Sequence, residues 1–136
     1  MDIARHIALI DELCFRPFPA EHGHFVAVLE CSRGPRDGDQ GERAVTVEQY
    51  EKYRDALHER LASRWGETEP WNLQTVLLRT ELEEIPEPWA ALSARARLAY
   101  VWEAAGTGRW VAVAVADRDE TDEVRLLAVV TQEAPP

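Results

Sequence analysis

The chain is short of cysteine, of lysine and of long apolar runs. Its two cysteines, Cys14 and Cys31, have neither the CxxC spacing nor the zinc-ribbon spacing, so we expect free thiols rather than a disulfide framework or a zinc site. No apolar run reaches the roughly 20 residues of a membrane span. Charged residues interrupt the apolar residues near the N-terminus, unlike those of a signal peptide. We therefore expect a cytoplasmic protein that does not associate with membranes.

Lysine occurs once, at Lys52, while arginine and alanine are abundant, a composition that fits a GC-rich bacterial genome. The 25 acidic residues outnumber the 15 basic ones, which gives a formal net charge of −10. Binding to nucleic acid or to anionic lipid needs clustered positive side chains, so we expect neither as a partner. A protein with a basic surface is compatible with this charge, because opposite electrostatic fields accelerate encounter.

Apolar spacing predicts a short N-terminal helix over residues 2–14 and a long helix over residues 46–65. A capping box formed by Thr46 and Gln49 starts the long helix, and Gly66 ends it. We expect this helix to pack on one face of a sheet through an apolar face made of Tyr50, Tyr53, Leu57 and Leu61.

Residues 97–131 predict a three-stranded antiparallel meander, because two turns separate three runs of strand-forming residues. Two registers are open for its first hairpin. A three-residue turn places Trp102 opposite Ala112, whereas a two-residue turn places Trp102 opposite Val111. A one-residue slip exchanges the two faces of a strand, so the pattern alone does not choose. The second register leaves a smooth face that a helix could approach closely, made of Ala112, Ala114 and Ala116.

Two further strands are predicted at residues 24–31 and 73–80, and one or two helical turns at residues 89–95. Residues 32–43 are rich in Gly, Pro, Asp and Arg and predict a mobile loop. Strands concentrated after the helices favour one α+β domain over residues 1–136, with an antiparallel sheet of about four to five strands.

The residues that could carry chemistry lack the spacing that catalysis or metal binding requires. His22 and His24 could hold a metal, but no spacing fixes a third ligand, for which the candidates are Glu21, Cys31 and His58. A cysteine nucleophile, Cys14 or Cys31, would need a histidine brought close by the fold. Paired carboxylates occur only in an exposed, proline-broken segment, at Glu81, Glu83, Glu84 and Glu87. No nucleotide-binding glycine motif occurs, so we expect no enzyme, metal or cofactor.

Tryptophan is frequent for this length, with five residues. Tryptophan dominates interface hot spots, and the acid-rich segments 81–87 and 117–123 could meet a basic partner. The candidate partner-binding residues are Glu83, Glu84, Glu87, Trp89, Arg109, Trp110, Asp117, Asp119, Asp122 and Glu123.

Three function hypotheses follow. The small, acidic, α+β character resembles the immunity proteins that neutralise bacterial toxins, a likeness of general character that involves no motif. It implies a non-enzymatic protein-binding module, of the immunity or antitoxin type, that inhibits a basic toxin domain. The alternative is a small-ligand-binding or regulatory domain with a pocket between the sheet and the 46–65 helix. The third is a small metal-dependent hydrolase that uses His22 and His24.

Overall fold

The computed structural model describes residues 1–32 and 40–136 and has the expected α+β fold. In chain order its elements are α1 (Ile3–Leu13), β1 (His24–Cys31), α2 (Gln40–Trp65), β2 (Trp71–Asn72), α3 (Leu73–Arg79), α4 (Trp89–Arg95), β3 (Ala96–Ala104), β4 (Arg109–Ala116) and β5 (Arg125–Thr131). The strands form one antiparallel sheet in the order β1-β5-β4-β3-β2. Within the described ranges, no helix has the length and apolar character to cross a membrane.

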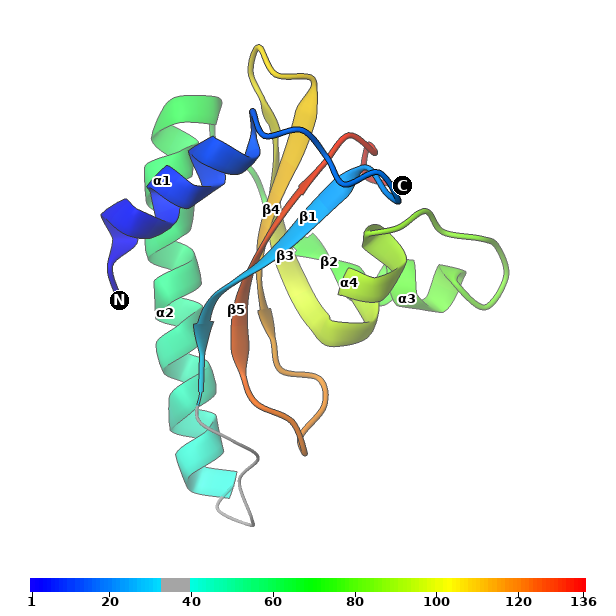
Figure 1. Cartoon of the computed structure of the whole chain (residues 1–136). Helices are drawn as coiled ribbons and strands as arrows, with labels where there is room; N and C mark the ends of the chain where they lie inside the picture. The colour runs from blue at the N-terminus through cyan, green and yellow to red at the C-terminus, as the bar shows by residue number, and fades with distance from the viewer. Residues whose placement is uncertain (33–39) are drawn as a thin grey trace.

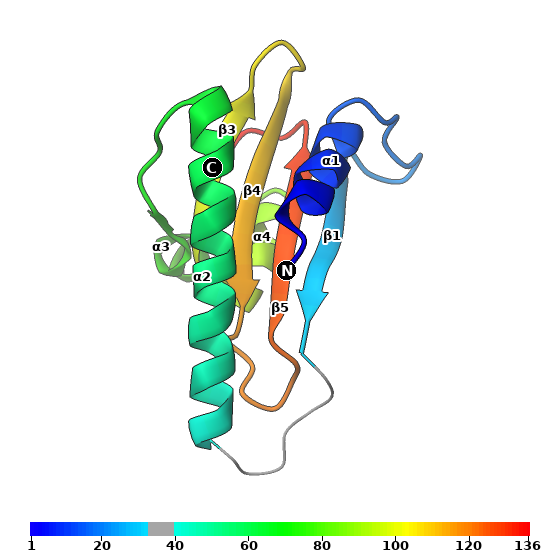
Figure 2. The same ribbon diagram turned by 90° about the vertical axis from the view of Figure 1, so that its left-hand side faces the viewer.

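Helices cover both faces of the sheet, which lies between them as a middle layer (Figures 1 and 2). The long helix α2 and the short helix α1 lie on one face. The packing of the long helix on a face of the sheet was expected. The short helices α3 and α4 lie on the opposite face. Each side has its own apolar cluster, one beneath α1 and α2 and one beneath α3 and α4.

Strand β4 shows why both faces need a cover, because every residue from Val111 to Ala116 is buried. Its valines belong to the cluster beneath α2 and its alanines to the cluster beneath α4. Trp102 pairs with Val111, so the second of the two open registers is the observed one. The turn itself is longer than that register assumed, since it spans residues 105–108. Short side chains on the alanine face let α3 and α4 pack closely.

Helix α2 begins at Gln40, earlier than predicted, so the capping-box assignment is wrong. Thr46 lies inside the helix, where its hydroxyl donates to the carbonyl oxygen of Glu42 at 3.1 Å. Threonine makes this backward bond within helices, so its spacing from Gln49 is no unique start signal. Residues 33–39 of the predicted mobile loop lie outside the described residues, and the end of that loop belongs to α2. Gly66, with a φ of 101°, ends the helix as predicted.

The strand predicted at residues 73–80 is wrong, because this segment forms helix α3. Asn72 caps the helix, and its side-chain oxygen accepts from the backbone nitrogen of Gln74 at 2.9 Å. Leu73 and Val76 are buried at a three-residue spacing, whereas Leu78 points to solvent. Short apolar runs fit a strand or a helix equally well, so the pattern did not decide. The short helices predicted at residues 2–14 and 89–95 are confirmed.

The face of α2 that packs on the sheet should dominate stability, because Leu57 and Leu61 are fully buried there. Leu57→Ala should lower the free energy of unfolding by about 2–5 kcal/mol through lost burial and a residual cavity. Urea denaturation measures this change, with Val45→Ala, on an exposed position of the same helix, as control. A loss below about 0.5 kcal/mol would show that the side chain does not pack in a core.

Candidate protein-binding surfaces

The connection between α3 and α4, residues 80–88, projects an apolar side chain into solvent. Leu82 is 88% exposed, and Leu78, near the end of α3, is 55% exposed. Exposed leucines gain little from folding, and a partner that covered them would remove their apolar surface from water. The neighbours of Leu82 in the chain are acidic and exposed, namely Glu81, Glu83 and Glu84.

Trp89, predicted as a partner contact, lies in the core at the base of this connection. Its ring is fully buried, and Nε1 donates to the carbonyl oxygen of Glu133 at 3.0 Å. Ile85 is also buried, so the connection is anchored close to the exposed leucine. Glu87 accepts a hydrogen bond at Oε2 from the backbone nitrogen of Ala91 at 3.0 Å and thereby caps α4. The side chains of Trp89 and Glu87 therefore make contacts within the fold.

The second acidic segment, residues 117–123 between β4 and β5, is held by a buried arginine from α2. Arg43 is only 9% exposed. Its Nη1 donates to the carbonyl oxygen of Asp122 at 2.7 Å, and Nη2 donates to those of Asp119 at 2.9 Å and Asp117 at 3.2 Å. One guanidinium thus fixes the main chain of the turn at three points. Of the acidic side chains of the turn, Asp119 and Asp122 are exposed, whereas Asp117 and Glu123 are half-buried.

Two carboxylates of this turn are stabilised in their charged form. The hydroxyl of Thr121 donates to Asp119 Oδ1 at 2.6 Å and lowers the pKa of that carboxyl group. Arg125 Nη1 donates to Asp122 Oδ2 at 2.9 Å and lowers the pKa of Asp122. Hydrogen bonds to a carboxylate favour its ionised form, so the turn keeps its negative charge below neutral pH.

Both cysteines are free thiols, and neither is activated as a nucleophile. Cys31 Sγ donates to Glu123 Oε2 at 2.6 Å, and this hydrogen bond raises the pKa of the Cys31 thiol. Burial raises the pKa of Cys14. A thiol whose pKa is raised is poorly nucleophilic, so the structure offers no support for cysteine catalysis.

Arg109 and Trp110 were predicted to contact a partner together, but their side chains lie on opposite faces of β4. Arg109 Nη1 donates to the carbonyl oxygens of Leu13 at 2.6 Å and Arg16 at 2.7 Å, which satisfies the end of α1. Its guanidinium also lies 3.8 Å from the ring centroid of Phe18. Trp110 is half-buried and packs against the cluster beneath α4. Neither forms an exposed aromatic anchor.

His22 and His24 stack on each other rather than converging on a metal position. Their ring centroids are 4.1 Å apart, and His22 Nδ1 lies 3.0 Å from the carbonyl oxygen of His24. His58, one candidate third ligand, instead packs against Tyr100 of β3 with the two rings tilted and their centroids 4.0 Å apart. The part of the chain that the structure describes contains no group of three metal-ligating side chains.

Two cavities lie between the long helix and the sheet in the described part of the chain. A cavity of about 70 Å³ there is lined in part by Arg54, Leu98 and Val115. A second, of about 260 Å³, lies near the start of α2. Ligand pockets are usually roughly 300–1,000 Å³. A groove of about 520 Å³ lies elsewhere, between α1 and β1.

Comparison with protein families, with curated proteins and with solved structures finds no match for this chain. The surfaces themselves therefore carry the functional inference. Sequence reasoning missed the exposure of Leu82, although a single leucine among three glutamates is a signal of a surface position. It also missed Arg43, because that residue lay in a segment predicted as a loop.

Removal of the Arg43 guanidinium should loosen the acidic turn. Arg43→Gln leaves carbonyl oxygens of residues 117–123 unsatisfied, so the free energy of unfolding should fall by about 1–3 kcal/mol. Hydrogen exchange in the turn should accelerate as well. Arg60→Gln, at an exposed position of the same helix, is the matched control. Equal stability of the two variants would contradict the clamp.

The histidine pair makes stability depend on pH. Burial and the neighbouring His22 lower the pKa of His24 below its ordinary value of 6.5, against a smaller opposing effect of Glu87. The unfolded chain therefore binds a proton more readily than the folded one, and stability is lost as pH falls from 6.5 through the folded value. Urea denaturation should show wild type losing stability relative to His24→Gln over this range. A difference independent of pH would contradict the assignment.

Proposed function

We propose that this chain is a non-enzymatic protein-binding module that masks a basic surface on another protein, in the manner of an immunity protein or antitoxin. The observation that carries the proposal is the exposure of Leu82, at 88%, in a row of glutamates. An apolar anchor ringed by charge is the usual composition of an interface centre and its rim. Burial of one leucine side chain contributes about 1.5–3 kcal/mol, which is sufficient for an anchor.

The connection that carries Leu82 is held by contacts within the chain. Arg79 Nη2 lies 2.9 Å from Glu83 Oε1, and this pair ties α3 to the connection. The burial of Ile85 holds its other side. Less conformational entropy is lost when a preformed loop binds, so pre-organisation supports affinity.

The charge distribution supports a basic partner. The net charge is −10, and the second acidic turn keeps its carboxylates ionised. Such a field accelerates encounter with a positively charged surface. The two acidic segments lie at different places on the molecule. Segment 81–87 connects α3 and α4, and segment 117–123 lies at the end of the sheet between β4 and β5 (Figure 1). We therefore propose that segment 81–87 anchors the partner through Leu82. The negative charges of segments 81–87 and 117–123 both attract it before contact.

Affinity capture with the immobilised chain, using the products of neighbouring genes in the native host, tests the anchor. Wild type should retain a basic protein, and Leu82→Asp should lose it because the anchor becomes charged. Phe15→Asp, at a position 74% exposed but distant in the chain, should behave as wild type. Retention by Leu82→Asp would show that this leucine is not the anchor, and a specific turnover without a partner would overturn the proposal.

A charge-matched pair of variants tests steering with the captured protein. Glu81→Gln combined with Glu84→Gln should slow association and flatten its dependence on salt, while dissociation changes little. Glu59→Gln combined with Glu69→Gln removes the same charge from other exposed positions and should have a smaller effect. Surface plasmon resonance at two salt concentrations separates the two rates. If both double variants slow association equally, the total charge of the chain, and not the charge beside Leu82, sets the association rate.

A further inference from the structure

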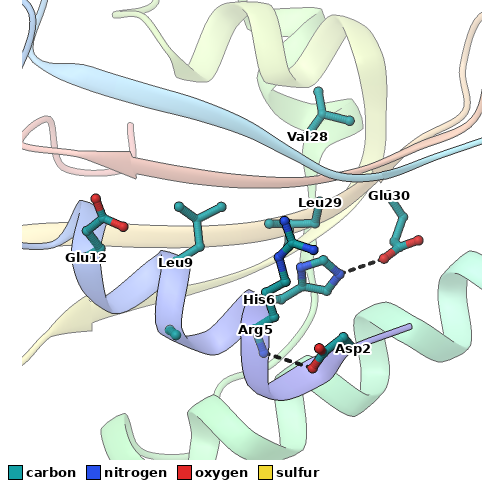
Figure 3. A pocket seen from close by; sticks show the side chains of 9 residues that line it. Asp2, Arg5, His6, Leu9, Glu12, Val28, Leu29 and Glu30 are labelled. Atoms are coloured by element: carbon teal, nitrogen blue, oxygen red, sulfur yellow. Dashed lines mark hydrogen bonds and ion pairs between the residues drawn. The ribbon is translucent and has the colours of Figure 1, made fainter.

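Strand β1 is an edge of the sheet, and it lacks the usual protection of an edge. Among the described residues it pairs with β5 only. His24–Cys31 contains no proline or lysine to discourage further pairing. Val26 and Val28 are 45% and 51% exposed. Both lie on the face that carries α4, since Val28 points away from α1 in Figure 3 and Val26 lines a small cavity together with Ala91 of α4.

The main-chain groups that remain free on β1 alternate along the strand. Just before the strand begins, and in register with the β1–β5 ladder, Gln132 N donates to the carbonyl oxygen of Gly23 at 3.1 Å. In an antiparallel ladder the residues that bond to the neighbouring strand recur at every second position. The N–H and C=O groups of His24, Val26 and Val28 therefore face away from the sheet, and those of the residues between them face β5.

The regular part of β1 ends at a bulge between Val28 and Glu30. Beyond it Glu30 lies on the α1 side, where its Oε2 is 2.7 Å from Nε2 of the buried His6 (Figure 3). The stretch before the bulge, His24–Val28, has free main-chain groups that are symmetric about Val26. A two-fold axis at Val26 therefore brings every free N–H of this stretch to a free C=O of an identical stretch.

We propose that two copies of this chain pair through β1 about a two-fold axis at Val26, which joins their two five-stranded sheets into one continuous antiparallel sheet. A two-fold interface is self-complementary, so each side chain meets a fixed counterpart. Val26 meets Val26 of the second copy at the axis. On the α1 face the large Phe25 lies opposite the small Ala27 of the second copy, which lets the two strands approach.

The charges beside this edge are complementary under the same axis. The charge of Glu87 acts on His24, so the start of α4 lies beside the start of β1. Arg95, at the end of α4, lines the same small cavity as Val26, and its guanidinium has no hydrogen bond or ion pair among the described residues. Glu87 caps α4 through Oε2 only.

The axis places the two α4 helices antiparallel on one face of the joined sheet. Arg95 of each copy then faces the end of the other helix that carries Glu87. This attraction is local, whereas the repulsion between two chains of net charge −10 is spread over their surfaces. Salt screens charges that lie more than about 8 Å apart at physiological ionic strength, so the distant repulsion weakens most.

The dimer leaves the proposed partner anchor free. Strands β1 and β2 are the opposite edges of the sheet, and α3 follows β2 directly (Figure 2). The joined sheet therefore presents Leu82 twice, near its two far ends. Pairing through β1 does not depend on the proposed function of Leu82.

Sedimentation velocity over about a hundredfold range of concentration tests the dimer, because association follows mass action. Wild type should shift from monomer to dimer as concentration rises. Val26→Lys should raise the dissociation constant at least about tenfold, since two ammonium groups then meet at the axis. Val45→Lys makes the same change at an exposed position of α2 and should dimerise as wild type. A monomer at every concentration, or equal loss of dimer in both variants, would overturn the proposal.

Amide hydrogen exchange tests the register. The amides of His24, Val26 and Val28 should exchange rapidly in the monomer and become protected as the dimer forms. The amides of Phe25 and Ala27 bond to β5 in both states and serve as the internal control. A dimer in which the three alternate amides stay unprotected uses another surface, and that result would contradict pairing through β1.

Charge variants test the axis. Arg95→Glu should weaken the dimer by about tenfold, because like charges then face each other across the axis. Arg60→Glu, at an exposed position of α2, makes the same change of charge and should have a smaller effect. Equal effects of these two variants would overturn the arrangement about Val26. Leu82→Asp should leave dimerisation unchanged, so a failure of the dimer and a failure of the partner anchor are separate results.

Discussion

The burial of the two central strands on both faces is the constraint on which the rest of the structure depends. Residues Val111–Ala116 of β4 and Leu126–Val130 of β5 are all buried. A sheet with two apolar faces must be covered twice, which requires α1 and α2 on one side and α3 and α4 on the other. The larger valine face accepts the long helix, and the flat alanine face accepts two short ones. The large apolar side chains that stay exposed lie outside these two strands, with Leu82 and Phe15 the most exposed.

The sequence predicts this architecture where the signals are local and fails where they are ambiguous. Strand and turn residues identify the meander, yet its register stays open because both faces of β4 are apolar. The apolar run at residues 73–80 fits strand or helix, and only the cap by Asn72 and the burial of Leu73 reveal the helix. Thr46 has the character of a helix start but lies inside one.

The candidate site was less predictable than the fold, since residue type says little about side-chain direction. Trp89 and Arg109 belong to types that are enriched at interfaces, yet one is buried and the other caps a helix. Leu82 belongs to a type that is common in cores, yet it is the most exposed of the large apolar side chains in the described structure. The direction in which a side chain points depends on how distant segments pack together. The spacing of residues along the chain does not contain that information.

Three arginines hold distant segments of the main chain together. Arg43, Arg109 and Arg118 donate to main-chain carbonyl oxygens of distant segments rather than to carboxylates. A guanidinium can bond several carbonyls in a fixed fork, which an ammonium group cannot, so the scarcity of lysine has a structural consequence besides a genomic one. The net charge of −10 follows from the excess of acidic over basic residues, and it underlies the proposal that the α3–α4 connection meets a basic partner.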